Sequence, residues 1–280
     1  MNETAMSNEL PDCTALALER RGSVLHVTLN RPDTRNLLDA TMVQELLAVT
    51  AAVRGDRSLR TLVLRGAGGT FCTGDDIRGF YEKMRDEVPA SGATDPVVRQ
   101  NRAFGDFLTA MNELPQTVVM LVEGEALGGG MGLVCVSDIA IAVCDTQFAL
   151  TETGFGLPAA QVAAFVVQRI GLTAARQLMM TGARFDGTRA GQLGLVHEVV
   201  PDPVALDVTL ARVLNQVGRC APGANAATKE ILFAAQSRPQ AEVLDMAAMH
   251  FAACMRGPEG REGVAAFLEK RPAGWIERTG

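Results

Sequence analysis

The chain has 280 residues, of which 48% are hydrophobic, so it is long enough to bury a substantial core in one or two domains. Its formal net charge is −6 and its Lys and Arg residues are scattered, which argues against nucleic acid or an anionic membrane as the main partner. The six cysteines include no C-x-x-C pair and lie mostly in apolar surroundings, so we expect buried free thiols and neither disulfides nor a zinc site. The polar N-terminus lacks a signal pattern and no apolar run nears the length of a membrane span, so the sequence predicts a cytoplasmic protein.

The first part of the chain predicts a strand, a helix and a second strand. Residues 24–29 alternate between apolar and polar side chains, which is typical of a half-buried strand. Asp39 can cap a helix whose apolar positions recur at helical spacing, namely Met42, Leu46, Val49 and Val53. Residues 61–64 form another apolar strand, which ends at a glycine-rich segment.

Residues 71–77 form a turn centred on a glycine. A segment rich in Pro, Ser, Gly and Ala follows at 88–95 and predicts a surface loop. Residues 98–112 have a helical pattern that ends before Pro115.

The segment 117–136 is the one around which the chain is organised. Residues 117–122 predict a buried strand, three consecutive glycines follow at 128–130, and residues 131–136 suit the start of a buried helix. A strand that turns through glycines into a helix leaves backbone N–H groups unpaired and open to close approach. The turn is therefore either a site for negative charge or a tight packing turn, and this segment alone does not decide between them.

The second half of the chain is mostly helical after Pro158. Short strands are predicted at 138–143 and 196–200, and helices at 159–170, 173–180, 186–193, 203–218, 223–236, 239–255 and 258–269. The alternation of strands and helices predicts an α/β fold of stacked units over residues 1–200, followed by a helical region over 201–280.

Familiar catalytic signatures are missing from the sequence. There is no dinucleotide-binding glycine motif, Walker loop, G-x-S-x-G elbow or H-E-x-x-H motif. The three histidines lie in separate segments without a nucleophile beside them, and we expect structural roles for them. Any chemistry must then come from carboxylates and backbone amides.

Several short segments carry a resemblance along nearly the whole chain. They are Leu29–Pro32 with Asn36–Leu37, Phe71–Ile77, Glu123–Gly130, Ser137–Ile139, Phe148–Glu152, Gly156–Pro158 and Ala190–Val196. In order and spacing the chain resembles the crotonase (enoyl-CoA hydratase/isomerase) superfamily. The resemblance implies a spiral of ββα units, a C-terminal helical region that mediates homotrimer contacts, often paired into hexamers, and an acyl thioester of coenzyme A as substrate. It implies no metal or redox cofactor.

The resemblance also assigns roles to particular residues. The backbone N–H groups of Asp75 and Gly129 would hold the thioester oxygen, where each such donor is worth roughly 10²–10³ in rate. Glu152 would transfer a proton at the α-carbon, and its mostly apolar segment predicts a raised pKa. The side chain of Asp75 is unusual, since the family position is usually small or apolar.

The most informative departure from the family is Gly132. Family hydratases typically use two glutamates, and the position of the one that activates water is glycine here. Three hypotheses follow: hydration of an enoyl-CoA with Glu152 as the sole glutamate, a Δ3,Δ2-enoyl-CoA isomerase that uses Glu152 alone, or a non-catalytic acyl-CoA-binding protein. Hydration is favoured, because segments 154–162 and 165–171 resemble the methylglutaconyl/isohexenylglutaconyl-CoA hydratase branch.

Further positions follow from the resemblance. Substrate-binding residues are expected at Arg35, Leu37, Thr73, Asp76, Ile77, Gly128 and Gly132. Possible auxiliary acids are Glu125, Asp75 and Asp76, the last of which we expect to organise its turn. A carboxylated acyl chain would need a cation from Arg78, Lys83 or Arg169, and Lys270 or Arg271 could meet the nucleotide phosphates of coenzyme A.

Overall fold

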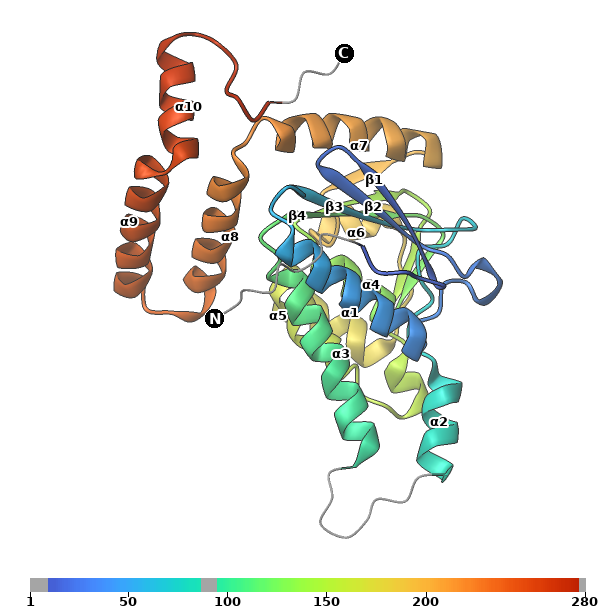
Figure 1. Cartoon of the computed structure of the whole chain (residues 1–280). Coiled ribbons are helices and arrows are strands. Elements are labelled where there is room, and N and C mark those ends of the chain that lie inside the picture. The colour runs from blue at the N-terminus through green and yellow to red at the C-terminus, as the bar shows by residue number, and fades with distance from the viewer. Residues whose placement is uncertain (1–9, 87–94, 277–280) are drawn as a thin grey trace, which may run out of the picture.

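The computed structural model describes residues 10–86 and 95–276, and within them the chain forms one large and one small sheet surrounded by helices (Figure 1). The large sheet has the strand order β1-β2-β3-β4-β6-β8, in which only the β1–β2 pair is antiparallel. Its strands are β1 (Leu16–Arg21), β2 (Val24–Leu29), β3 (Thr61–Gly66), β4 (Thr117–Val122), β6 (Ile139–Val143) and β8 (Glu198–Val200). The small sheet pairs β5 (Glu125–Leu127) with β7 (Gln147–Ala149) in parallel.

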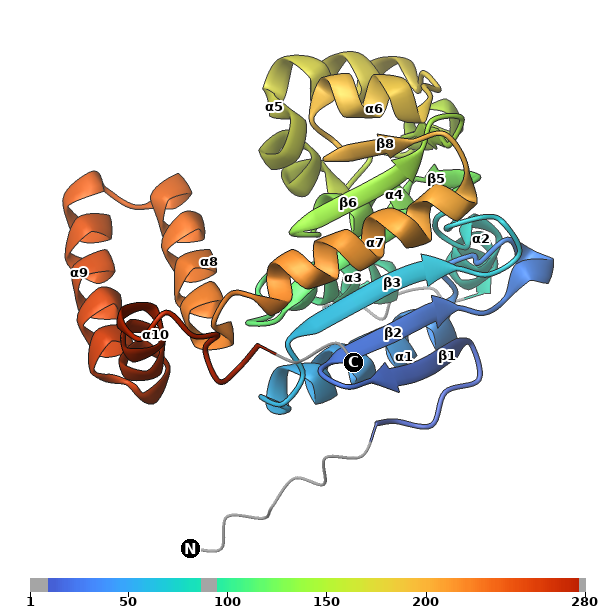
Figure 2. The same ribbon diagram turned by 90° about the horizontal axis from the view of Figure 1, so that it is seen from above.

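Helices cover both faces of the large sheet, as continuous apolar strands such as β3 and β4 require. One face carries α1 (Ala40–Gly55), α3 (Pro96–Asn112), α4 (Gly129–Cys135) and α5 (Val162–Thr181), which share the main core with it. On the other face α7 (Pro203–Gly218) packs Leu206, Leu210 and Val213 against the sheet (Figure 2). This architecture confirms the predicted α/β class.

Local chemistry explains the predicted helices that the structure contains. The Asp39 carboxylate accepts the N–H of Met42 at 2.8 Å and begins α1, whose four predicted apolar positions are buried. Gly171, at φ 76° and ψ 159°, interrupts α5 where the sequence predicts a break between two helices. The helix α6 (Gly187–Leu193) begins at Asp186, which caps it.

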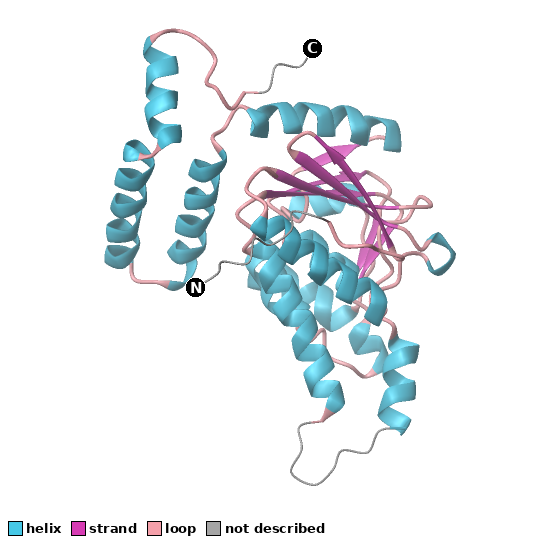
Figure 3. Ribbon diagram, viewed as in Figure 1, coloured by secondary structure: helices cyan, strands magenta, loops and turns pink. Residues whose placement is uncertain are grey.

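The last three helices stand away from the sheets (Figures 1 and 3): α8 (Pro222–Ser237), α9 (Gln240–Arg256) and α10 (Pro258–Leu268). They expose large apolar side chains, among them Leu244, Met249, Phe251 and Phe267. Lys229 ties α8 to the body by donating to the carbonyls of Leu114 and Gln116 and pairing with Asp138. Although α7 lies beyond residue 200, it packs on the sheet and not with these three helices.

Three strands of the structure were not predicted from the sequence. The strands β5 and β7 have three residues each, too few for a periodic pattern, and β1 is exposed along most of its length. The predicted loop at 88–95 lies outside the described residues except for Asp95, whose carboxylate caps α3.

All six cysteines are free, as predicted, but not all of them are buried. Cys72 and Cys135 are buried, whereas Cys220 is exposed. Among the helices of the described residues, none combines the length and apolar character needed to cross a bilayer.

Candidate active site

The two glycine-containing turns of the sequence lie side by side. The N–H of Cys72 donates to the carbonyl of Glu125 at 2.9 Å, and the N–H of Leu127 donates back to Cys72 at 3.0 Å. Gly74 has φ 90°, and a Cβ on it would lie 2.7 Å from the Leu127 carbonyl oxygen. Glycine at this position therefore allows the backbones of the two turns to approach each other closely.

Two backbone amides converge where these turns meet. Gly128, at φ 49°, leads into α4, and Gly129 is the first residue of that helix. Within the described residues, the N–H groups of Gly129 and Asp75 donate to no backbone carbonyl, and both lie close enough to the Asp75 carboxyl group to lower its pKa. The two amides assigned from the sequence to the thioester oxygen thus lie beside one carboxyl group.

Glu152 faces the same point from a third element, the short 3-10 helix η2 (Glu152–Phe155). A Cβ on Gly128 would lie 3.2 Å from Glu152 Oε1 and 3.8 Å from Asp75 Oδ2, so both carboxyl groups flank the turn at Gly128. Glu152 Oε2 is buried and has no hydrogen-bond partner among the described residues. It is therefore positioned to give or take a proton.

Burial changes the acidity of both carboxyl groups. Burial raises the pKa of Glu152, and its own backbone N–H partly opposes this. Burial, with the nearby charge of Glu152, raises the pKa of Asp75 to about 6, against the stabilising N–H groups of Gly129 and Asp75 itself. The raised pKa expected for Glu152 is confirmed in direction, and that of Asp75 was not anticipated.

Gly132 lies away from this pair and serves packing. A Cβ there would lie 2.5 Å from Cγ1 of Val162, the first residue of α5, and 3.7 Å from Leu108. Gly132 is a buried residue of α4. A side chain at this position would require the Val162 side chain to shift.

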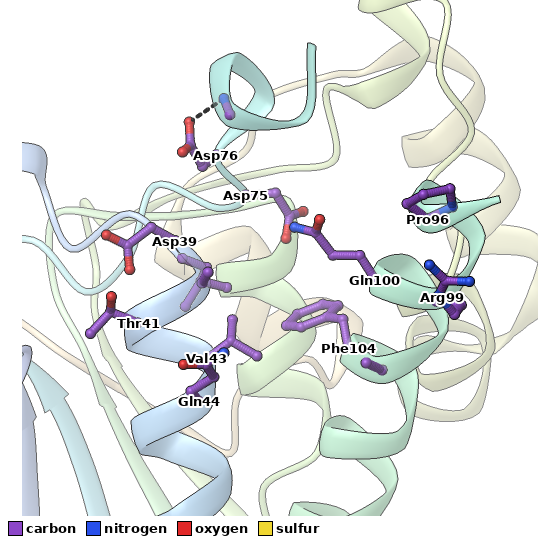
Figure 4. Close-up of a pocket in the computed structure, with 14 residues that line it drawn as sticks. Asp39, Thr41, Val43, Gln44, Asp75, Asp76, Pro96, Arg99, Gln100 and Phe104 are labelled. Atoms are coloured by element: carbon purple, nitrogen blue, oxygen red, sulfur yellow. Dashed lines mark hydrogen bonds between the residues drawn. The ribbon is translucent and has the colours of Figure 1, made fainter. Parts of the chain in front are cut away.

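A cavity of about 620 Å³ lies between α1, α3 and α2 (Ile77–Asp86), within the size range of small-molecule sites (Figure 4). Asp75 and Asp76 line one end of it, and Phe104 and Val43 provide apolar wall. The side chain of Gln100 points toward Asp75. Glu152 is not a lining residue, so Asp75 is the group that connects the cavity with Glu152.

Other predicted site residues have local structural contacts. Arg35 pairs with Glu125 at 2.7 Å, and Glu125 also binds Arg184 at 3.1 Å, so this possible auxiliary acid is held in an ion-pair network. Asp76 Oδ1 accepts the N–H of Gly79 at 2.9 Å in the first turn of α2 and organises the turn as expected. The carbonyl of Arg35 accepts from Thr73, which keeps the segment containing Leu37 beside the turn that precedes Ile77.

Two of the cations proposed from the sequence, Arg78 and Arg169, are not part of the cavity lining. Arg169 donates to the carbonyls of Leu195 and Ser137, and Arg78 is exposed and pairs with Glu82. The side chain of Lys83 lies outside the described residues. Arg99 of α3 lines the cavity instead, together with Gln100. Sequence reasoning missed both, because only the packing of α3 beside α1 brings them to the site.

The remaining predictions concern phosphates, histidines and metals. Arg271 binds Glu262 and Glu269. His197 accepts the N–H of Ala140, and His250 lies 3.3 Å from Glu230, as expected for structural residues. In residues 10–86 and 95–276, no group of three or more His, Cys, Asp or Glu side chains is arranged to hold a metal ion.

Comparison with known proteins gives a consistent result. The family described as "Enoyl-CoA hydratase/isomerase" matches residues 19–278. The structure of Pseudomonas aeruginosa AtuE is similar, with a TM-score of 0.89 and 51% identity over 94% of this chain and 100% of that one. An enoyl-CoA hydratase/isomerase from Marinobacter aquaeolei has a TM-score of 0.91 and 45% identity over 95% and 100% of the two chains. The enoyl-CoA hydratase EchA19 of Mycobacterium tuberculosis is 29% identical over 93% of this chain and 96% of its own length.

Proposed function

Because the chain belongs to the enoyl-CoA hydratase/isomerase family of the crotonase superfamily, we propose that it is a hydratase that adds water across the 2,3 double bond of an enoyl-CoA. Family membership makes the protein an enzyme with an acyl-CoA substrate, which removes the non-catalytic hypothesis. The observation that carries the proposal is the placement of Glu152, whose unpaired, buried carboxyl oxygen lies beside the turn that presents the Gly129 amide.

The chemistry follows from this placement. In the proposed reaction the thioester oxygen takes the N–H groups of Asp75 and Gly129 as donors, and these stabilise the negative charge that develops as water attacks the β-carbon. Glu152 gives its proton to the α-carbon. Burial raises the pKa of Glu152, so more of it carries a proton near neutral pH than an ordinary glutamate would.

The acyl chain that we propose is a branched, carboxylated glutaconyl-type chain. The cavity that begins at Asp75 has room for such a chain beside Phe104 and Val43, and Arg99 supplies a guanidinium group to its lining. Arginine suits a carboxylate because its planar donors bind both oxygens. Arg99 is not one of the cations suggested from the sequence, which were Arg78, Lys83 and Arg169.

Coenzyme A is proposed to lie along Arg35, Leu37, Thr73 and Ile77, at the open side of the same turn. A homotrimer, or a hexamer built from trimers, is proposed through α8–α10. Its support is the exposed apolar surface of these helices, which includes Phe251 and Phe267, since apolar side chains gathered on one region mark protein contacts.

The second candidate is a Δ3,Δ2-enoyl-CoA isomerase. Gly132 favours it, because one carboxyl group suffices to move a proton between C2 and C4 and the isomerase needs no group to activate water.

The test is an assay of the purified protein with crotonyl-CoA, a 3-enoyl-CoA and 3-methylglutaconyl-CoA. We expect loss of the conjugated enoyl absorbance together with incorporation of water. Glu152→Gln should lower kcat by about 10²–10⁴-fold. Glu113→Gln, an exposed glutamate at the end of α3, is the matched control and should keep the wild-type rate. Conversion of the 3-enoyl to the 2-enoyl thioester without water uptake would establish the isomerase instead.

A further inference from the structure

Hydration moves two protons: one leaves the attacking water and one is added to the α-carbon. If Glu152 were the only catalytic carboxyl group, it would have to reach both positions. Gly132 supplies no acid, and the Val162 side chain lies where a side chain of this residue would begin. A second proton acceptor would therefore have to come from a different element. It would also have to lie at the end of the cavity where the acyl chain meets the turn.

Asp75 meets these requirements. It lines the cavity, and its carboxyl group and that of Glu152 each lie within 4 Å of the point where a Cβ on Gly128 would be. The two groups come from different elements, the turn before α2 and the helix η2, so they can stand on different sides of a bound acyl chain. In the described residues, no salt bridge holds the Asp75 carboxylate in place.

We propose that the carboxylate of Asp75 is a second catalytic group, which takes a proton from the attacking water while Glu152 gives a proton to the α-carbon. This inference rests on the proposed hydratase function and supplies its missing base. The carbon–carbon double bond becomes a single bond, the water oxygen bonds to the β-carbon, and one water proton moves to Asp75. The Glu152 proton bonds to the α-carbon. Afterwards Asp75 loses its proton and Glu152 regains one by exchange with solvent, so the protons balance over a turnover.

The present position of the Asp75 carboxyl group defines the first event of this sequence. This group lies beside the N–H groups of Gly129 and Asp75, which the thioester oxygen must take as donors. Substrate binding therefore displaces the carboxylate from the turn into the cavity, toward Gln100, whose side chain points at it (Figure 4). The displaced carboxylate then stands beside the acyl chain, where the water attacks.

The two carboxyl groups influence each other's ionisation, and the charge of Glu152 helps to raise the pKa of Asp75. Two carboxyl groups close together do not ionise with equal ease, and such pairs commonly divide into an acid and a base. Besides Glu152 of η2, the charged groups of described residues that face Asp75 across the cavity are Asp39 beside α1, Asp76 beside α2 and Arg99 of α3. At pH 7.5 Asp75, with a pKa of about 6, is mostly ionised and can act as the base.

The test compares Asp75→Asn and Asp75→Ala with Asp106→Asn, an exposed aspartate of α3 that serves as the control. We expect kcat for hydration to fall by about 10²–10³-fold in both Asp75 variants, and the fall in kcat/KM below pH 6 to disappear from their residual activity. If Asp75 merely occupied the amides, Asp75→Ala would lower KM and keep kcat. A kcat within threefold of the wild type overturns the inference.

A second readout separates catalysis from loss of the fold. The α-proton of a saturated acyl-CoA exchanges in D₂O through Glu152 and the two amides without any attack by water. We expect Asp75→Asn to keep this exchange within about threefold while hydration is lost, and Glu152→Gln to lose both. Equal loss of exchange and hydration in Asp75→Asn overturns the role in water activation. Failure of the wild type to hydrate any thioester refutes the hydratase itself, whereas an active wild type with an unaffected Asp75→Asn refutes only this inference.

Discussion

Two carboxylate sites in this fold have opposite surroundings. Asp138, next to β6, accepts the N–H of Val118 at 2.7 Å and pairs with Lys229, whose ammonium also binds two backbone carbonyls. Asp75 and Glu152 instead face each other across Gly128, and neither forms an ion pair with a described residue. The first site uses its charge to attach α8 to the sheet, and the second leaves its carboxyl groups available for proton transfer.

The difference has a cost in stability that depends on pH. A carboxyl group whose pKa is raised in the folded state binds protons more tightly there than in the unfolded chain, so stability falls as pH rises through the window between the two pKa values. For Asp75 this window runs from 3.8 to about 6. The Asp75–Glu152 pair therefore weakens the fold at neutral pH.

The largest effect is expected at Lys229. Lys229→Met leaves the Asp138 carboxylate and the carbonyls of Leu114 and Gln116 without their cation. Removing one partner of a fully buried pair costs about 3–5 kcal/mol, which is the upper limit for this partly buried pair. Denaturant unfolding of the variant measures this loss. The double variant with Asp138→Asn should recover part of it, because no unpaired charge remains. An unchanged unfolding midpoint in Lys229→Met would show that the pair does not hold α8.

A smaller effect of opposite sign is expected at Asp75. Asp75→Asn removes a charge that the folded state disfavours, so it should raise the free energy of unfolding by about 1–2 kcal/mol at pH 7.5. At pH 4 the wild-type group is largely neutral in the folded state, and the gain should nearly vanish. Thermal melts of both proteins at the two pH values measure the difference. A destabilised Asp75→Asn at both values would make Asp75 a structural residue and contradict the contrast with Asp138.

The smallest effect is expected at Asp106, which pairs with Arg102 one helical turn earlier on the exposed side of α3. Such pairs contribute about 0.3–0.5 kcal/mol, because water screens the charges. Asp106→Asn should therefore change the unfolding free energy by no more than this, and 0.5 M salt should remove the difference. A larger loss would mean that α3 is only marginally stable. The measured effects of substitutions at the cavity would then include a loss of α3.

Periodicity and capping were enough to predict most of the helices and strands. The Asp39 cap, the apolar positions of α1 and the break at Gly171 are local features, and the structure contains each of them. The strands β1, β5 and β7 were missed, because a short or exposed strand has no hydrophobic pattern of its own. Their pairing is supplied by neighbours that are distant in the sequence.

For the site, residue types at given positions were enough to predict the glycine turns, the Glu152 segment and the absence of an acid at Gly132. The sequence did not predict that the Asp75 carboxyl group lies beside the two amides, that it faces Glu152, or that Arg99 lines the cavity. The reason is physical. A pKa and a cavity depend on distances between elements, and the packing of α3 beside α1 and of η2 beside α5 sets those distances.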